Sequence, residues 1–232
     1  MLIIADHKMP DEAKHKLSRY GELVEFSTSG ITYEAISGHP DIFFCRHSMD
    51  DGIGYRLIAA PNVPDKYFRI LEAKSIQYLK GIRPVGIRYP ASALYNAVMT
   101  GGRLIHRLDI SDEALLQRAV ERINVPQGYT RCSLLELVPD VFITSDMGIY
   151  NALYGHAKDI LFVKPDNIRL PGFKHGFFGG TCGIRGNSIF LAGSLDYTSD
   201  PPAIRKFLQK YGYDIIELCD EPLFDCGSIL FL

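Results

Sequence analysis

The feature that most constrains this chain is a sequence pattern of strand, helix and strand that is repeated along its length. In each copy, a run rich in Ile, Val, Leu or Phe precedes a helix whose first turn carries Pro or acidic residues. Acidic residues interact favourably with the positive end of the helix dipole, and Pro fits where no N–H is needed. A second apolar run follows each helix, and the middle helix is expected to extend through Arg122. The three copies lie at 2–26, 103–137 and 189–218.

A second phrase has the pattern of a β-hairpin, in which a Gly-containing turn separates two apolar strands. The combined hairpin-and-helix units begin near residues 43, 86, 141 and 179, and a fifth unit is split between the chain ends. The strand at 223–232 has nothing after it and the strand at 2–5 has nothing before it, so we expect the two to pair. The hairpin pattern occurs at 50–61, 93–106, 148–163 and 180–193.

Self-similarity with a period of about 40–50 residues is typical of repeat arrays, because each unit leaves an apolar face that only its neighbours cover. The sequence therefore predicts a single α/β domain over 1–232. Its expected architecture is a five-fold pseudosymmetric β/α-propeller of ββαβ units, with the first blade closed by both chain termini. Composition agrees with a globular domain, because 47% of the residues are hydrophobic and only 22% are charged.

Charge and hydropathy patterning exclude several classes of partner. Lys and Arg number 25 and Asp and Glu number 27, which leaves no excess of positive charge for binding nucleic acid. No apolar run reaches the roughly 18–20 residues of a membrane helix. Asp6 interrupts the N-terminal apolar run too early for a secretory signal. We therefore expect a cytoplasmic protein with neither a nucleic-acid nor a membrane partner.

Metal and cofactor motifs are absent from the sequence. The five cysteines form no CxxC pair, which argues against a zinc knuckle. His39 and His106 belong to a set of histidines without metal-ligand spacing, for which surface or turn positions suffice. The segment at 52–57 begins like GxGxxG but lacks the third Gly, so it fails the dinucleotide test. We expect neither a metal nor a cofactor.

An array of five ββαβ units with its first blade built from both chain ends resembles the pentein fold. This is the β/α-propeller of guanidine-modifying enzymes and of a non-catalytic ribosomal anti-association factor. The enzymes end in a strand with a catalytic Cys, then a small or apolar residue and a hydroxyl residue, and this chain has DCGSIL at 225–230. They place a catalytic His at the entry to the preceding hairpin, where this chain has His175. The resemblance implies Cys226 as nucleophile and His175 as acid and base.

The carboxylates by which these enzymes hold a guanidinium are not matched at the family positions. Phe177 stands where the family has an acid two residues after the His, and His47 stands near the place of another. In a five-fold ring, Arg46, His47 and Asp51 lie at a strand end that faces the central channel, and Asp146 occupies the corresponding place in a later unit. Arg46 can bind a carboxylate or phosphate bidentately. We assign these four residues to substrate binding, with a solvated turn, or an Asx turn at Asp146, as the alternative.

Two functions follow from these observations. The first is a cysteine-dependent hydrolase or transferase that acts on a small, polar, guanidine- or amidine-like substrate in the central channel, through a covalent adduct of Cys226. The alternative is a pentein-like binding or interaction protein without catalysis, in which Cys226 is a core residue. The first fifty residues are also similar to the opening of D-2-hydroxyacid dehydrogenases. We interpret that likeness as a βαβ phrase shared by many α/β folds.

Overall fold

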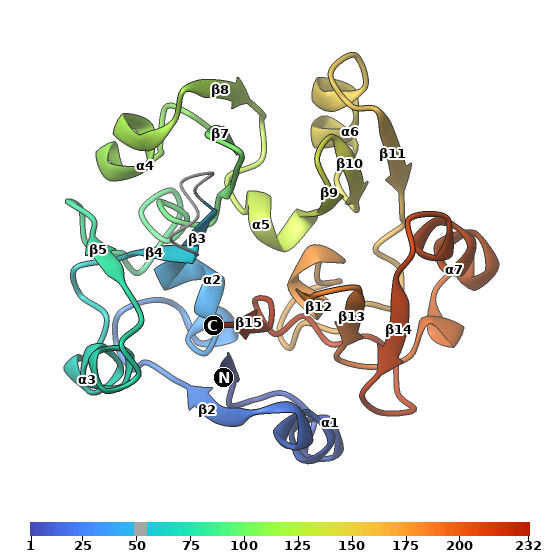
Figure 1. Ribbon diagram of the computed structural model, residues 1–232, viewed down its shortest axis with the longest axis horizontal. Helices are drawn as coiled ribbons and strands as arrows, with labels where there is room; N and C mark the ends of the chain where they lie inside the picture. Colours follow the sequence, from blue (N-terminus) through green and yellow to red (C-terminus); the bar gives the residue numbers. More distant parts are fainter. Residues whose placement is uncertain (49–54) are drawn as a thin grey trace.

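The computed structural model describes residues 1–48 and 55–232, which form a mixed α/β fold (Figure 1). Within these residues the strands group into five units. Each unit pairs two strands antiparallel and adds a third strand parallel to the middle one. A helix joins the middle strand to the third strand, because a parallel connection needs a crossover.

The elements of each unit follow the order strand, strand, helix, strand, with the first unit drawn from both chain ends. The first unit contains β15 (Leu230–Phe231), β1 (Leu2–Asp6), α1 (Asp11–Leu17) and β2 (Glu22–Phe26). The second contains β3 (Phe44–Ser48), β4 (Tyr55–Ala59), α3 (Asp65–Ala73) and β5 (Tyr78–Lys80). The third contains β6 (Val98–Thr100), β7 (Arg103–His106), α4 (Glu113–Arg118) and β8 (Glu121–Asn124). The fourth contains β9 (Leu134–Val138), β10 (Val141–Thr144), α6 (Met147–Leu153) and β11 (Asp159–Phe162). The fifth contains β12 (Cys182–Arg185), β13 (Ser188–Leu191), α7 (Pro201–Lys210) and β14 (Asp214–Glu217).

Two sequence-based assignments are wrong in detail. The middle helix ends at Arg118 rather than Arg122, because the backbone turns extended at Ala119 and β8 then pairs parallel with β7. The segment 148–163 is a helix followed by a strand, not a hairpin, because Asp146 caps α6 and starts the crossover between β10 and β11. The expected hairpins at 93–106 and 180–193 are present. In the segment 50–61, residues 50–54 lie outside the described part of the chain.

Figure 1 shows the longer helices α1, α3, α4, α6 and α7 at the periphery and the short helices α2 (Pro40–Phe43) and α5 (Thr130–Ser133) nearer the centre. Each short helix immediately precedes the first strand of its unit. The 3₁₀ turn Gly179–Thr181 precedes β12 in the same way. The segments that begin the units therefore meet in the middle of the molecule.

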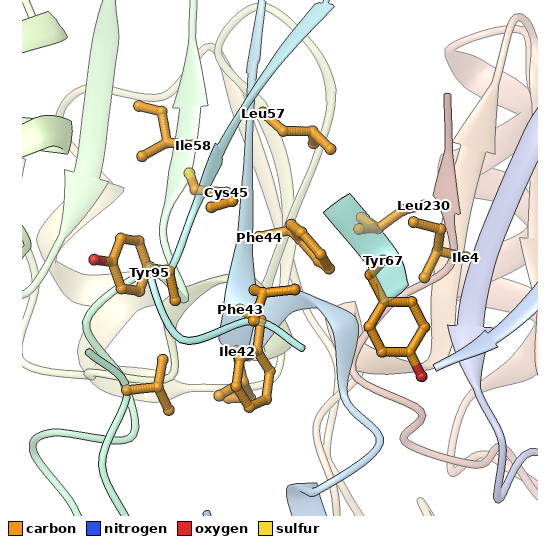
Figure 2. Close-up of a cluster of buried hydrophobic side chains, with 14 of the residues drawn as sticks. Ile4, Ile42, Phe43, Phe44, Cys45, Leu57, Ile58, Tyr67, Tyr95 and Leu230 are labelled. Carbon is orange, nitrogen blue, oxygen red and sulfur yellow. The ribbon is translucent and has the colours of Figure 1, made fainter. Parts of the chain in front are cut away.

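The last strand pairs with the first, as the sequence predicts. β15 lies antiparallel to β1, with Leu230 opposite Ile4, and β1 continues parallel to β2. Figure 2 shows Ile4 and Leu230 in one buried cluster with Phe43, Phe44 and other apolar side chains of the second unit. This cluster ties the two chain ends to the neighbouring unit. No helix in the described ranges has both the length and the hydropathy to span a lipid bilayer.

Candidate active site

Four polar side chains from different units meet where the unit-starting segments converge. Cys132 of α5 has its Sγ 3.2 Å from Oδ2 of Asp41 in α2. Ser228, just before β15, donates to the same Oδ2 at 2.7 Å. Asn96, just before β6, donates from Nδ2 to Cys132 Sγ at 3.2 Å and accepts from the Cys132 N–H at 3.1 Å. We call Asp41, Asn96, Cys132 and Ser228 the central polar cluster; all four are at most 3% exposed.

His39 lies beside this cluster between two buried carboxyl groups. Its Nε2 is 3.7 Å from Oδ2 of Asp6, and its Nδ1 is 4.0 Å from Oδ1 of Asp225. Neither ring nitrogen has a hydrogen-bond partner among residues 1–48 and 55–232, although His39 is only 1% exposed. Burial lowers the pKa of His39 to about 3, so the ring is neutral near pH 7. Burial also raises the pKa of Asp225 to about 8 and raises that of Asp6.

Glycines allow these three side chains to pack so closely. A Cβ atom added at Gly38 would overlap the carboxylate of Asp6. One added at Gly180 would overlap Asp225. Gly227 has a φ of +59°, and a Cβ there would overlap the Cβ of His39. The arrangement around His39 therefore depends on positions where any side chain would collide with the site.

A cavity of about 400 Å³ opens above the cluster, and we call it the aromatic cavity. Five groups with acid, base or nucleophilic chemistry line it: His39, Cys132, Lys174, His175 and Asp225. The Asp225 carboxylate is held by the N–H groups of Phe177, at 2.8 Å, and Gly227, at 3.2 Å. The aromatic side chains of the lining are Tyr33, Tyr89, Tyr129, Phe173 and Phe177.

The aromatic cavity contains one member of the catalytic pair expected from the sequence. His175 is half-buried in its lining, with Nδ1 3.0 Å from the carbonyl oxygen of Gly176. Cys226 is fully buried, and its Sγ donates to the carbonyl oxygen of Gly180 at 3.3 Å. The residue belongs to an apolar cluster that includes Ile3 and Phe190. Burial, followed by the nearby Asp225 carboxylate, raises the pKa of the Cys226 thiol well above its ordinary value.

The residues expected to bind substrate are dispersed. Arg46 lines a second cavity of about 240 Å³, which Asp41 also lines. His47 is buried on β3. Asp146 accepts hydrogen bonds from the Ile149 N–H and from Gln127 Nε2, both at 2.9 Å, and so acts as the N-cap of α6. Asp51 lies outside the described residues.

Sequence reasoning missed His39, Asp41, Cys132 and Asp225. The repeat itself could have indicated most of the residues at the centre, because in each of the five units the residue two or three positions before the first strand lies there. The surface or turn position expected for His39 is wrong, since the side chain is buried.

His39, Asp41 and Cys132 also offer one nitrogen, one oxygen and one sulfur atom within 4.8 Å of one another, a set that can hold a metal ion. The residues two or three positions before the first strand of each unit are Asp41, Asn96, Cys132, Gly180 and Ser228.

Comparisons with solved structures identify the fold. An amidinotransferase, SxtG from Microseira wollei in the saxitoxin biosynthetic pathway, is 11% identical with a TM-score of 0.54, covering 99% of this chain and 93% of that one. The agmatine deiminase of C. jejuni is 11% identical with a TM-score of 0.55, covering 93% and 86%. A Cys-to-Ser mutant of DDAH from Pseudomonas aeruginosa, complexed with citrulline, is 10% identical with a TM-score of 0.52, covering 93% and 91%. The pentein fold expected from the sequence is thus confirmed.

Comparisons of sequence place the chain more narrowly. No curated protein matches it. A family model described as "Family of unknown function (DUF6873)" matches residues 4–230, which is nearly the whole chain. The chain therefore belongs to DUF6873, a family of unknown function whose fold in this member is that of the penteins.

Proposed function

We propose that this protein is a divergent pentein enzyme that takes a small amidine- or guanidine-like cation into the aromatic cavity and acts on its C–N bond through a covalent cysteine adduct. The observation that supports this most is a buried carboxyl group, Asp225, in a cavity lined by five aromatic side chains. Lys174 also lines the cavity, but its side chain is exposed. A planar delocalised cation donates hydrogen bonds to a carboxylate and stacks on aromatic faces. Asp225 takes the place of the family carboxylates that have no match in the sequence.

We also infer that the five units are the blades of a five-fold propeller, with both chain termini in one blade. Support comes from the repeated order of strand, strand, helix and strand and from the pairing of β15 with β1. In such a ring the inward segments share one centre, which is where Asp41, Cys132 and Ser228 are in contact. Substrate then enters along the axis from the side of the aromatic cavity.

The thiol best placed for the covalent step is that of Cys132. Its side chain lines the aromatic cavity, whereas the sulfur of Cys226, the nucleophile inferred from sequence, packs in the apolar cluster. Burial, together with the Asp41 carboxylate, raises the pKa of the Cys132 thiol well above its ordinary value. A bound cation favours the thiolate, so binding of substrate activates the sulfur.

The chemical steps use groups that line the aromatic cavity, together with Asp41, which contacts Cys132. Asp41 accepts the thiol proton, and the sulfur of Cys132 forms a bond to the amidine carbon. One C–N bond of that carbon breaks as its nitrogen leaves with a proton, for which we assign His175 as the acid. Water then adds to the same carbon and gives a proton back to His175, the C–S bond breaks, and Asp41 returns its proton to the sulfur. An amine acceptor in place of water gives the transferase reaction.

The test compares two alkylating agents of similar shape, cationic chloroacetamidine and neutral chloroacetamide, on protein freed of metal by a chelator. We expect chloroacetamidine to modify Cys132 at least about tenfold faster, because only the cation pairs with Asp225. Mass spectrometry locates the adduct. We expect Asp225→Asn to remove the preference for chloroacetamidine. We expect guanidinium compounds to slow the alkylation of Cys132 in the wild type. The control Cys219→Ser keeps the preference for chloroacetamidine, since Cys219 is not part of the cavity lining.

Each other outcome overturns part of the proposal. An adduct at Cys226 replaces Cys132 by the nucleophile expected from the sequence. Equal rates for the two reagents overturn the cation site. Cation protection without any adduct leaves a binding protein, the alternative to catalysis.

A further inference from the structure

We propose that His39, Asp41 and Cys132 bind one Zn²⁺ ion, with the fourth coordination position open toward the aromatic cavity. One donor atom from each side chain lies within 4.8 Å of the other two, and all three side chains are buried. Imidazole nitrogen, carboxylate oxygen and thiolate sulfur are the ligands that zinc prefers in proteins. Three protein ligands with a free fourth position are typical of reactive rather than purely structural zinc sites.

Distances within the set are close to those of a coordinated ion. Cys132 Sγ lies 3.2 and 3.4 Å from the two carboxylate oxygens of Asp41. Around a tetrahedral zinc, bonds of about 2.3 Å to sulfur and about 2.0 Å to oxygen put these two atoms about 3.5 Å apart. The ion would therefore replace the thiol proton between Cys132 and Asp41, and binding would release that proton. A ring nitrogen of His39 lies within 4.8 Å of both atoms, so a small shift of the ring completes the set.

His39 supplies the independent observation. Both ring nitrogens lack a hydrogen-bond partner in the described part of the chain, although the side chain is 1% exposed. A buried polar group without a partner is uncommon and calls for a ligand. One ring nitrogen faces Asp6 and the other faces Asp225, at 3.7 and 4.0 Å. Whichever nitrogen binds the ion, the other one faces a carboxylate, as is usual for a histidine that binds zinc.

The remaining ligands also have the supporting contacts of a metal site. Asn96 Nδ2 donates to Cys132 Sγ at 3.2 Å, and Ser228 Oγ donates to Asp41 Oδ2 at 2.7 Å. Hydrogen bonds of this kind orient ligands toward an ion. The carboxyl groups of Asp6 and Asp225, on either side of His39, are also buried, and a divalent cation favours their ionised forms.

Zinc binding is separate from the proposed enzymatic function, because it requires no substrate. It does have a consequence for that function. A sulfur atom bound to zinc is not available to attack an amidine carbon, so the zinc-bound protein and the reactive thiol are two exclusive states of Cys132. The chelator in the labelling experiment above selects the reactive state.

The test is a zinc titration of the metal-free full chain against a chromogenic indicator. We expect one Zn²⁺ per chain and a rise in melting temperature on binding, because the ion stabilises only the folded protein. Cys132→Ser and Asp41→Asn should each weaken binding by at least about 100-fold, since each removes or weakens a ligand. Cys45→Ser is the control, a buried thiol bonded instead to the carbonyl oxygen of Ala97.

Cobalt gives a second readout that does not depend on stability. Co²⁺ in the site should show thiolate-to-metal charge-transfer absorption, which Cys132→Ser abolishes and Cys45→Ser retains. Absence of stoichiometric zinc binding, or binding that survives both ligand variants, would overturn the site. Neither result changes the outcome of labelling by chloroacetamidine on metal-free protein, so the two proposals fail separately.

Discussion

Cys132 Sγ lies 3.2 Å from Asp41 Oδ2, although 91 positions separate the two residues in the chain. Each residue belongs to a one-turn helix directly before the first strand of its unit. The repeat therefore brings distant residues together without any local motif. Different polar side chains meet at the centre because the units contribute different residues at equivalent positions.

Cys132→Ala should lower the free energy of unfolding by about 1–3 kcal/mol, because Asp41 loses a buried donor and Asn96 loses an acceptor. Cys132→Ser should cost less, since its hydroxyl can donate to Asp41 and accept from Asn96. Urea unfolding of the three proteins measures the difference. An alanine variant as stable as the serine variant would contradict a hydrogen-bonded role for this thiol.

The repeated units could be predicted because strand and helix periodicities are local. The hairpin at 180–193 was recognisable from its turn, in which Gly186 takes a φ of +55°. The sequence of the segment 148–163 resembles that of the hairpin at 93–106 and therefore predicts a second hairpin, which the structure does not contain. Its environment differs: β10 precedes it, and Asp146 provides a helix cap. A crossover to a parallel strand requires the helix that local similarity did not indicate.

The candidate site was less predictable because neighbouring residues face different sides. The sequence indicates the segment around Asp225 and Cys226, but it does not indicate which of the two side chains lines the cavity. Asp225 lines the aromatic cavity, and Cys226 points into the apolar cluster. In extended backbone, a shift of one residue exchanges the two sides, and only the packed structure decides between them.

Gly180→Ala should destabilise the protein by about 1–3 kcal/mol and reduce labelling of the cavity, because the added methyl group would displace Asp225. Gly155→Ala is the matched control, since a Cβ there meets nothing within 4 Å. Thermal unfolding and labelling by chloroacetamidine are measured on both variants. Equal behaviour of the two would show that close packing at Gly180 does not position Asp225.

His106 should make the protein less stable as the pH falls. The ring is fully buried, within 2.7 Å of Ser111 Oγ and 2.9 Å of the Gly128 carbonyl oxygen, and burial lowers its pKa to about 4. In the unfolded chain its pKa is about 6.5. Between these values the unfolded chain binds a proton that the folded protein does not, so the free energy of unfolding falls as pH drops from about 6.5 to about 4, by about 3 kcal/mol at most.

The measurement compares urea unfolding at pH 7 and pH 5 in the wild type and His106→Gln. The variant should lose less stability between the two pH values, whatever its stability at pH 7. The comparison uses the difference in pH dependence because His39, also buried with a lowered pKa, titrates in the same direction in both proteins. An unchanged pH dependence would mean that the pKa of His106 is the same in the folded protein and in the unfolded chain.

Leu230→Ala should lower the free energy of unfolding by about 2–5 kcal/mol, the usual cost of emptying a buried leucine site. Leu230 is 4% exposed, lies opposite Ile4 in the pairing of β15 with β1, and packs in the cluster of the second unit (Figure 2). Val120→Ala is the control, because Val120 is 94% exposed. If denaturant unfolding shows Leu230→Ala to be no more costly than the control, pairing of the chain ends adds little stability. A loss confined to the first unit, seen as faster hydrogen exchange in β1 and β2 alone, would show instead that the unit opens independently of the other four.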